Sequence, residues 1–340
     1  MLTLEQRIES LGVLGRIIKL NPKALSAAVS KACAENPWFT QEGYYFMLSA
    51  INEHFLDPEK LHSFAHSYPE LNKQHTSKWV GLVMAGNLPL VGFHDVLCVF
   101  LAGHRCQIKL TEKDQWVWPV LLELWIEAYP VIKEYVCFEE RLSGFEAVIA
   151  TGSNLSARYF NKYFGHYPHL IRQNRNSIAV LTGKESADEL ELLGKDIFSF
   201  LGLGCRNVSS LFLPREFDIK QLFGCWDSFD YVINNHKYKH NFDYHLATLI
   251  INNLPYIENG FVILHPNPQL ASRVAVVHYQ MYENLPDVLT MLSHQELQIQ
   301  VIVSQKPLPG WKHVYFGTSQ KPELNDFADR VDTMAFLLQL

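Results

Sequence analysis

The pattern of hydrophobic and polar positions divides the chain into a helical region and a following α/β region. Up to about Leu71, apolar residues recur at helical spacing, as Leu4, Ile8 and Leu11 do. From Lys78 onward, nearly continuous apolar runs of strand length alternate with amphipathic segments of helix length. Such alternation across short loops indicates parallel βαβ units, so we predict an α/β fold with doubly wound sheets.

The helical region carries clear start signals. Thr3 with Gln6 forms a capping-box pattern, and Asp57 followed by a proline is typical of a helix start. Gly12 and Gly15 weaken the continuation of the first helix, so the pattern leaves its end open. We find no candidate chemistry in this region and interpret it as a helical cover.

Two successive sets of strands and helices follow. For the first set we predict strands at residues 78–86, 106–110, 145–150 and 177–181, with helices at 90–102, 114–128 and 154–164. For the second set, which begins near Gly183, we predict helices at 187–201, 218–226, 244–252 and 285–292 and strands at 207–213, 261–264, 274–279 and 297–303. Ser186 with Glu189 is expected to cap the first helix of this set, and Asp243 the third.

Composition narrows the class of protein. With 340 residues, 48% hydrophobic and 19% charged, the chain has the profile of a soluble globular protein. The net charge of −6 argues against a nucleic-acid partner, and no apolar run reaches the ~18 residues of a membrane span. The first residues lack the apolar core of a signal peptide, and six cysteines are scattered without disulfide or metal spacing. We therefore expect reduced thiols and a cytoplasmic location.

Four turns at the ends of the predicted elements hold the candidate functional residues. Their sequences are Gly86-Asn87-Leu88-Pro89, Lys109-Leu110-Thr111-Glu112, Thr151-Gly152-Ser153 and Gly204-Cys205. Each has an ordinary structural interpretation as well: asparagine and serine favour turns and caps, and a cysteine packs as a small hydrophobic residue. Their combination within one βαβ framework is more specific than any one of them.

The order and spacing of these turns resemble the aldehyde dehydrogenase superfamily. In that superfamily an N-x-P turn follows the first buried strand, a K-P-S-E-like turn follows the second, T-G-S opens a helix and G-Q-x-C ends one. The GCRNVS context and the tail FGTSQKPELNDFADRVDT look most like the acyl-CoA/acyl-protein thioester reductases, the LuxC-like family. The resemblance covers the chain from Lys78 to its last residue.

The resemblance implies a domain organisation. Residues 1–183 would form the helical N-terminal region and a Rossmann-like, nicotinamide-cofactor-binding domain. Residues 184–314 would form the catalytic domain with the cysteine nucleophile, and residues 315–340 would return to the cofactor domain. The hairpin that builds oligomers in full-length superfamily members is not apparent upstream of Lys78, so a homodimer and an enzyme complex both stay open.

The same resemblance assigns roles to the turn residues. Cys205 would be the nucleophile that takes an acyl group from an acyl-CoA or acyl-carrier-protein thioester, and Asn87 would donate a hydrogen bond to the oxyanion. Lys109 and Glu112 would hold the adenosine ribose, while the sequence Thr151-Gly152-Ser153 would approach the cofactor at a helix N-terminus. A glutamate at position 112 favours NADH, but the thioester reductases resemble NADPH users, so the choice between NADH and NADPH stays open.

One departure from the superfamily pattern bears on the reaction. Aldehyde-oxidising members carry a glutamate that activates water, whereas the matching stretch here reads Arg172-Gln173-Asn174-Arg175. The absence of a carboxylate favours reduction of the acyl-enzyme to an aldehyde over its hydrolysis. The two arginines are either solvated or available to acidic parts of coenzyme A or of a carrier protein.

The remaining candidates are weaker, and two other functions stay open. His236, His240 and His245 lack the spacing and the carboxylate of a known metal motif, so we expect no metal. Trp116, Trp118 and Trp125 in the 114–128 helix are expected in the core.

Cys205 would also suit an acyltransferase or thioesterase without a nicotinamide cofactor, and the fold would suit a non-catalytic binding subunit.

Overall fold

The computed structural model describes residues 2–73 and 76–340 and divides into two compact units. Unit 1 runs to Asn174 and takes in Pro322–Leu340, and unit 2 is Arg175–Lys321. Within the described residues, no helix has both the length and the apolar character that a membrane crossing needs.

The first part of unit 1 is helical, as predicted. Its helices are α1 (Leu4–Leu20), α2 (Lys23–Glu35), α3 (Gln41–Ala50), the π-helical η1 (Ile51–Phe55), α4 (Pro58–His66) and the 3₁₀ turn η2 (Pro69–Asn72). The capping box at Thr3 and the Asp57 cap are both confirmed, because each side chain accepts a backbone N–H of its helix. These caps satisfy N–H groups that have no partner within the helix.

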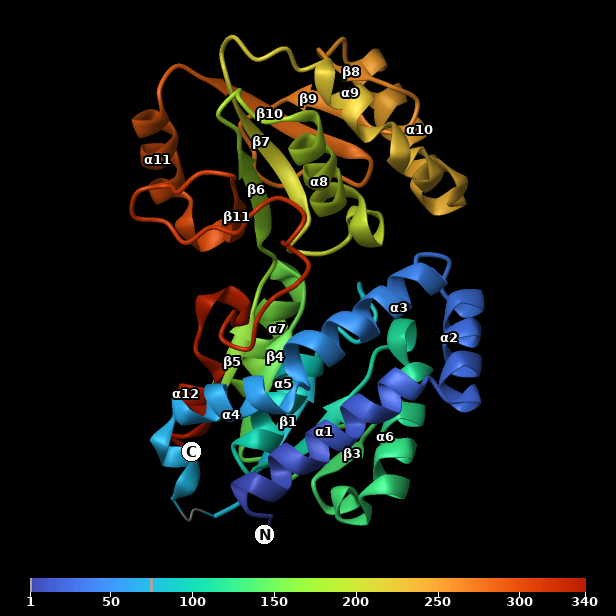
Figure 1. Cartoon of the computed structure of the whole chain (residues 1–340), viewed down its shortest axis with the longest axis vertical. Helices are drawn as coiled ribbons and strands as arrows, with labels where there is room; N and C mark the ends of the chain where they lie inside the picture. The colour runs from blue at the N-terminus through green and yellow to red at the C-terminus, as the bar shows by residue number, and fades with distance from the viewer. Residues whose placement is uncertain (1, 74–75) are drawn as a thin grey trace. The chain divides into compact units, whose positions relative to one another are not determined.

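The glycines of α1 do not end the helix, which the sequence had left open. A Cβ at Gly15 would come within 2.7 Å of Asn52 Oδ1 and 3.1 Å of Leu56 Cβ, so the close approach of η1 requires glycine there. The intrinsic helix cost of a glycine, about 1 kcal/mol, is therefore outweighed by packing. Figure 1 shows α1 lying along α6, and the two helices are in contact.

Unit 1 is built on a five-stranded parallel sheet. Its strands are β1 (Trp79–Val83), β2 (Arg105–Lys109), β3 (Val136–Phe138), β4 (Ala147–Thr151) and β5 (His169–Arg172), in the order β3-β2-β1-β4-β5. The connections contain α5 (Phe93–Leu101), η3 (Glu112–Asp114), α6 (Val117–Ala128), η4 (Pro130–Glu134) and α7 (Asn154–Phe164). The last residues add η8 (Ala328–Arg330) and α12 (Thr333–Leu337), and α12 packs against α5.

Unit 2 contains a six-stranded sheet in the order β11-β6-β7-β10-β9-β8, with only β8 antiparallel. Its strands are β6 (Asn176–Val180), β7 (Val208–Pro214), β8 (Ile257–Glu258), β9 (Ile263–Pro266), β10 (Val276–Tyr282) and β11 (Ile299–Val303). Its helices are α8 (Ala187–Phe198), η5 (Ser199–Gly202), α9 (Gln221–Trp226), η6 (Asp227–Asn234), α10 (His236–Ile251), α11 (Leu285–His294) and η7 (Glu296–Gln298). The predicted capping box at Ser186 is confirmed.

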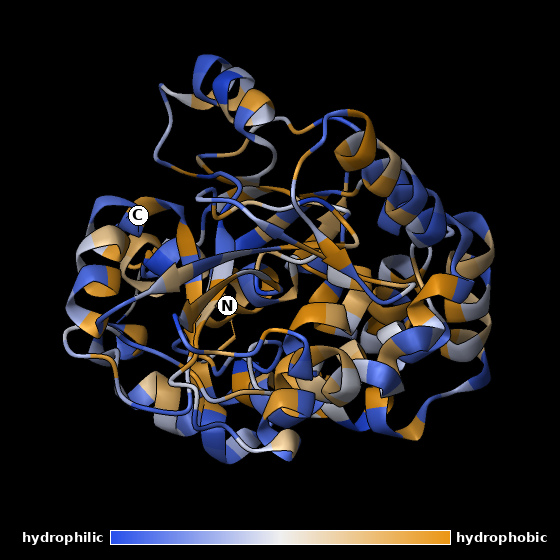
Figure 2. Ribbon diagram, turned by 90° about the horizontal axis from the view of Figure 1, so that it is seen from above, coloured by the Kyte–Doolittle hydropathy of each residue, from blue (hydrophilic) through white to orange (hydrophobic). Residues whose placement is uncertain are grey.

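Both sheets bear out the predicted α/β class. In Figure 2 the helices carry hydrophilic and hydrophobic residues together, as expected of helices with one side on a sheet and the other in solvent. The strands β1, β4 and β7 have buried centres, which explains their near-continuous apolar runs.

Two predictions about individual elements are wrong. The strand predicted at 177–181 for the cofactor domain is β6, which pairs with β7 and β11 in the sheet of unit 2. An apolar run that is buried on both faces can pair with any parallel neighbour. Its sequence therefore does not specify the sheet to which the strand belongs. Asp243 caps no helix: α10 begins at His236, capped by Asn235, and Asp243 pairs with Lys239 inside it.

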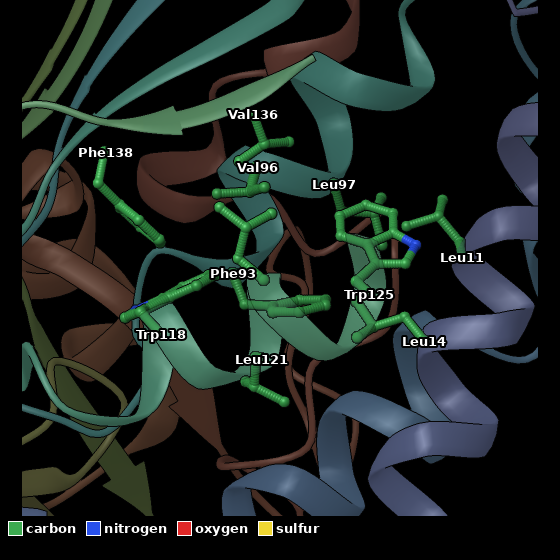
Figure 3. A pocket seen from close by; sticks show the side chains of 11 residues that line it. Leu11, Leu14, Phe93, Val96, Leu97, Trp118, Leu121, Trp125, Val136 and Phe138 are labelled. Carbon is green, nitrogen blue, oxygen red and sulfur yellow. The ribbon is translucent and has the colours of Figure 1, made fainter. Parts of the chain in front are cut away.

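Trp118 and Trp125 of α6 lie in the core, as expected, whereas Trp116 precedes α6 and is only half-buried. Trp118 and Trp125 line an apolar cavity that Figure 3 shows in close-up. The other lining residues come from α1, α5, α6, β3: Leu11, Leu14, Phe93, Val96, Leu97, Leu121, Leu122, Val136 and Phe138. Trp116 is half-buried, and Lys31 Nζ lies over its ring, 3.7 Å from the ring centroid.

Candidate active site

Cys205 lies in the turn that joins η5 to the amino end of β7. Its side chain is exposed, whereas the other five cysteines are buried or half-buried. Burial raises the pKa of the Cys98 and Cys106 thiols well above the usual value, so these two thiols are unreactive. Exposure and placement on a turn make Cys205 the best candidate nucleophile of the six.

The turn around Cys205 is fixed by Asn207, a buried residue that the sequence reasoning did not single out. Asn207 Oδ1 accepts the Gly204 N–H at 2.8 Å, and the Asn207 N–H donates to the Gly204 carbonyl at 3.0 Å. Asn207 Nδ2 donates to the carbonyl oxygens where α8 ends, those of Asp196 (3.1 Å), Ile197 (3.1 Å) and Ser199 (2.8 Å). Ser177 Oγ adds a bond to the Cys205 carbonyl at 2.9 Å.

The backbone that leads into this turn is left-handed over three residues. Phe200, Leu201 and Gly202 have φ values of 52°, 57° and 74°. Only glycine adopts such angles readily, and each of the other two residues costs about 1–2 kcal/mol. Such strain persists only where the surrounding contacts impose it, and the Asn207 bonds supply contacts of this kind.

A buried carboxylate holds a further segment beside the end of α8. Asp196 accepts the Gly317 N–H at 2.6 Å and the Ser319 N–H at 2.9 Å. Burial raises the pKa of Asp196 to about 6, although these bonds and Arg206 oppose the shift. Arg206, the neighbour of Cys205, donates from Nε to the Ser319 carbonyl, so the Cys205 turn and residues 317–319 are tied together.

In unit 1 the Asn87 turn follows β1. Asn87 is exposed, and Leu90, three residues later, has a left-handed φ of 52°. Gly86 lies against the next predicted turn, because a Cβ there would overlap Thr111 Oγ1. The absence of a side chain at Gly86 therefore lets the two turns touch.

The Lys109 and Glu112 turn follows the neighbouring strand. Lys109 is the last residue of β2 and Glu112 the first of η3, and both are exposed. Between them, Thr111 Oγ1 is buried with no hydrogen-bond partner among the residues that the structure describes. The exposed lysine can bind a phosphate and the exposed glutamate can accept from ribose hydroxyls, whereas the buried Thr111 hydroxyl is not accessible to a ligand.

The third predicted turn follows β4. Thr151 ends the strand, and Ser153 is the N-cap of α7, accepting the Ser156 N–H at 3.1 Å. A Cβ at Gly152 would meet Ser156 Cβ at 2.8 Å and Phe160 Cε2 at 2.9 Å. Glycine is thus required there by the packing of α7, and the free N–H groups of the helix start remain the feature that suits an anion.

The sheet of unit 1 brings three of the four predicted turns to one edge. β1 pairs with β2 on one side and with β4 on the other, all in parallel. The carboxyl ends of these strands, with Asn87, Lys109, Glu112 and the 151–153 turn, therefore lie along the same edge. Cys205 belongs to unit 2, so its joint role with Asn87 stays a prediction.

Arg172 is neither solvated nor available to an acidic ligand, so both interpretations offered for it are wrong. It is buried in unit 1, where Nη1 contacts both oxygens of Asp95 at 2.7 and 2.6 Å and Nη2 donates to Thr333 Oγ1 at 2.8 Å. The Asp95 carboxylate holds the pKa of Arg172 above its usual range despite burial, so the guanidinium is charged. Arg172 is a structural ion-pair partner.

The three histidines once considered for a metal lie on α10. His236 and His240 are one helical turn apart, with ring centroids 6.1 Å from each other. Across the described ranges, no group of three or more histidine, cysteine, aspartate or glutamate side chains is arranged to hold a metal ion.

Comparison with known proteins places the fold. No protein-family model and no curated protein matches the sequence. Solved structures do match: an aldehyde dehydrogenase from Bacillus cereus in complex with NAD⁺ has a TM-score of 0.64 and 14% identity, covering 90% of this chain and 72% of that one. A mutant aldehyde dehydrogenase C from Pseudomonas syringae, in complex with NAD⁺ and octanal, has a TM-score of 0.66 and 11% identity, with coverages of 90% and 73%.

A further match is the NAD-dependent aldehyde dehydrogenase from Sinorhizobium meliloti, with a TM-score of 0.65, 10% identity and coverages of 89% and 71%. At such low identity these likenesses speak to the fold. The chain has the aldehyde dehydrogenase fold, as the four turns predicted.

Proposed function

We propose that this protein reduces an acyl thioester to an aldehyde with NADH or NADPH, through an acyl group carried on Cys205. The observation that carries the proposal is the strand order β3-β2-β1-β4-β5 in unit 1. In open parallel sheets, ligands bind beyond the carboxyl ends of the strands where the order reverses, here between β1 and β4. Three predicted turns lie along that edge, and the aldehyde dehydrogenases noted above include NAD⁺ complexes of the same fold.

The residues at this edge suit a dinucleotide. The N-terminus of α7 offers backbone N–H groups for the pyrophosphate, and Lys109 offers a positive charge nearby on β2. The exposed Glu112 carboxylate suits ribose hydroxyls. The nicotinamide, when bound, supplies the hydride that reduces the acyl group. Glu112 would repel a 2′-phosphate, so NADH is the better fit of the two cofactors.

Cys205 is the proposed acyl carrier. Its thiolate attacks the thioester carbonyl, the carbon–sulfur bond to the donor breaks, and the donor leaves as a thiol. Asn87, carried over from the resemblance, is the proposed donor to the oxyanion, together with the Cys205 backbone N–H. One such donor is typically worth ~3–4 kcal/mol of transition-state stabilisation.

The fate of the acyl group depends on the residues at the sequence position where aldehyde-oxidising members of the superfamily carry a glutamate that activates water. That stretch holds Arg172, which is buried in its pair with Asp95, and no carboxylate. Without a base to activate water, reduction is favoured over release of a free acid. The GCRNVS context supports the LuxC-like thioester reductases within the superfamily, and acyl-CoA or an acyl carrier protein is the proposed donor.

Intact-mass spectrometry tests the proposal. The protein is incubated with a panel of acyl-CoAs and acyl carrier proteins, and NADH or NADPH is added second. We expect one acyl adduct on the wild type, its loss on addition of the reduced nucleotide, and an equivalent of aldehyde. Cys225→Ala, which removes a half-buried cysteine, is the matched control and should behave as the wild type.

Each alternative function has its own outcome in the same experiment. An adduct that persists in Cys205→Ala contradicts the assignment of the nucleophile. Thioester cleavage without aldehyde would favour the acyltransferase or thioesterase. A Cys205 that resists alkylation at neutral pH, with no acyl adduct, would favour a binding subunit.

A further inference from the structure

Asp114 connects two of the predicted cofactor-edge turns through one buried side chain. It ends η3, two residues after Glu112, and is 3% exposed. Its Oδ2 accepts the Leu90 N–H at 2.7 Å, and Leu90 belongs to the turn that carries Asn87. Its own N–H donates to the Thr111 carbonyl at 3.1 Å, within the turn that carries Lys109 and Glu112.

The remaining bond of the carboxyl group anchors it to a helix of unit 1. Tyr44, fully buried in α3, donates its O–H to Asp114 Oδ1 at 2.9 Å. The carboxyl group of Asp114 therefore receives donors from α3 and from the Asn87 turn.

The Leu90 bond matters because the Asn87 turn is strained. Leu90 has a φ of 52°, which a residue with a branched side chain adopts only under constraint. The constraints on this turn include the Asp114 bond at Leu90 and the contact of Gly86 with Thr111. Both constraints come from the residues that follow β2, so the position of Asn87 depends on the Lys109–Glu112 turn.

We propose that Asp114 is a positioning residue that holds the Asn87 turn and the Lys109–Glu112 turn in one fixed arrangement, and so sets the affinity of unit 1 for the reduced nicotinamide nucleotide. The proposal rests on the proposed function for its ligand, but its structural part concerns unit 1 alone. Asp114 itself touches no substrate or cofactor in this scheme.

Three variants separate positioning from simple loss of stability. Asp114→Ala removes the acceptor for Leu90. Asp114→Asn keeps an acceptor oxygen of the same size and is the conservative rescue. Tyr44→Phe is the matched control, because it removes a bond to the same carboxylate at the same buried site and leaves the Leu90 bond in place.

Two measurements are made on each full-length variant: amide hydrogen exchange of the peptide covering residues 86–92, and the dissociation constants of NADH and NADPH by nucleotide fluorescence. For Asp114→Ala we expect the exchange rate at Leu90 and the nucleotide dissociation constants to rise by roughly tenfold, because a buried N–H loses its acceptor. Asp114→Asn should recover most of both effects. Tyr44→Phe should change neither by more than about threefold, although it removes a buried bond of similar type.

The outcomes decide the proposal in each case. Unchanged exchange over 86–92 in Asp114→Ala overturns it, and so does equal weakening of nucleotide binding in Tyr44→Phe and Asp114→Ala. If the wild type binds neither nucleotide, the proposed function fails. The exchange data then decide by themselves whether Asp114 holds the two turns.

Discussion

The Cys205 turn of unit 2 and the Asn87 turn of unit 1 are each held by one buried polar side chain, but of different chemistry. Asn207 meets three carbonyl oxygens and one N–H, so it must both donate and accept. Asp114 meets the N–H of Leu90 and the hydroxyl of Tyr44, so it needs only to accept. The end of a helix leaves carbonyl groups without partners, whereas the Asn87 turn and its neighbouring side chains present donors.

The side chain that holds each turn therefore matches the backbone and side-chain groups that need a hydrogen-bond partner there. The two side chains also differ in whether they can carry a charge. The carboxamide of Asn207 does not titrate, whereas burial raises the pKa of Asp114 to about 7. Unit 1 holds a second charged anchor, the pair of Arg172 and Asp95. The contrast between the ionisable anchors of unit 1 and Asn207, which does not titrate, can be tested by removing these side chains one at a time.

The largest effect is expected for Arg172→Met. This change leaves Asp95 buried without its partner, and breaking a buried pair in this way costs about 3–5 kcal/mol of the free energy of unfolding. Urea denaturation of wild type and variant measures the loss. The double variant Arg172→Met/Asp95→Leu should recover a large part of it, because no charge is left unpaired. A single variant within 1 kcal/mol of wild type, roughly the worth of an exposed pair, would contradict a buried charge.

The second effect is a pH dependence of stability caused by Asp114. Its folded pKa of about 7 lies above the unfolded value, so its contribution to stability is fully present below the unfolded pKa and is lost as pH rises toward 7. Asp114→Asn should therefore gain stability relative to wild type between pH 4 and pH 8, by up to about 4 kcal/mol for such a shift. Urea denaturation across this pH range measures the difference between the two proteins. A difference that stays constant with pH would show that Asp114 does not titrate there.

Asn207→Ala tests the neutral anchor. It leaves carbonyl groups at the end of α8 and the Gly204 N–H without their partner, so we expect a loss of about 2–3 kcal/mol from unsatisfied buried groups. The loss should not vary between pH 5 and pH 8, unlike the difference in stability between Asp114→Asn and the wild type. Asn207→Asp is the matched control: it retains the acceptor for Gly204 but not the donors, and should stay destabilised. Full stability in Asn207→Asp would mean that the carbonyl contacts contribute little.

The smallest effect concerns apolar packing in unit 1. Val136→Ile adds one methylene on β3 toward the cavity of Figure 3 and keeps a β-branched side chain that suits a strand. Filling a cavity of this kind typically adds about 0.5–1 kcal/mol of stability. A thermal scan detects this as a small rise in the midpoint. Val80→Ile, at a buried strand position outside that cavity lining, is the control and should be neutral or destabilising through overpacking.

Much of the fold could be predicted from the sequence because its signals are local. The apolar runs at β1, β4 and β7 and the caps at Thr3 and Ser186 each specify their own element. The neighbours of a strand within a sheet are distant in sequence. The run that begins at Ser177 could therefore be predicted as a strand, but the sheet to which it belongs could not. β3 and β5 were not predicted, since both are short and the edge strand β5 is only half-buried over most of its length.

The turns that carry the candidate site residues could be predicted from the sequence. The buried side chains that hold these turns in place could not. Cys205, Asn87 and Lys109 stand in recognisable motifs. Asn207 and Asp114, three positions after Gly204 and five after Lys109, belong to no motif, and polar residues are usually exposed to solvent. Only the folded chain shows that these two side chains are buried and bonded to the turns.

The return of the chain to unit 1 bears on the order in which the protein can fold during synthesis. Unit 2 is continuous in sequence, so all of it has been made before Pro322 emerges from the ribosome. Until Thr333 and Leu337 follow, Arg172 keeps its pair with Asp95 but lacks the Thr333 hydroxyl, and the imidazole of His104 lacks the Leu337 carbonyl. In the finished protein α12 packs against α5. In a nascent chain stalled within unit 2, α12 has not yet been made. We therefore expect α5 in such a chain to be accessible to water or to a chaperone.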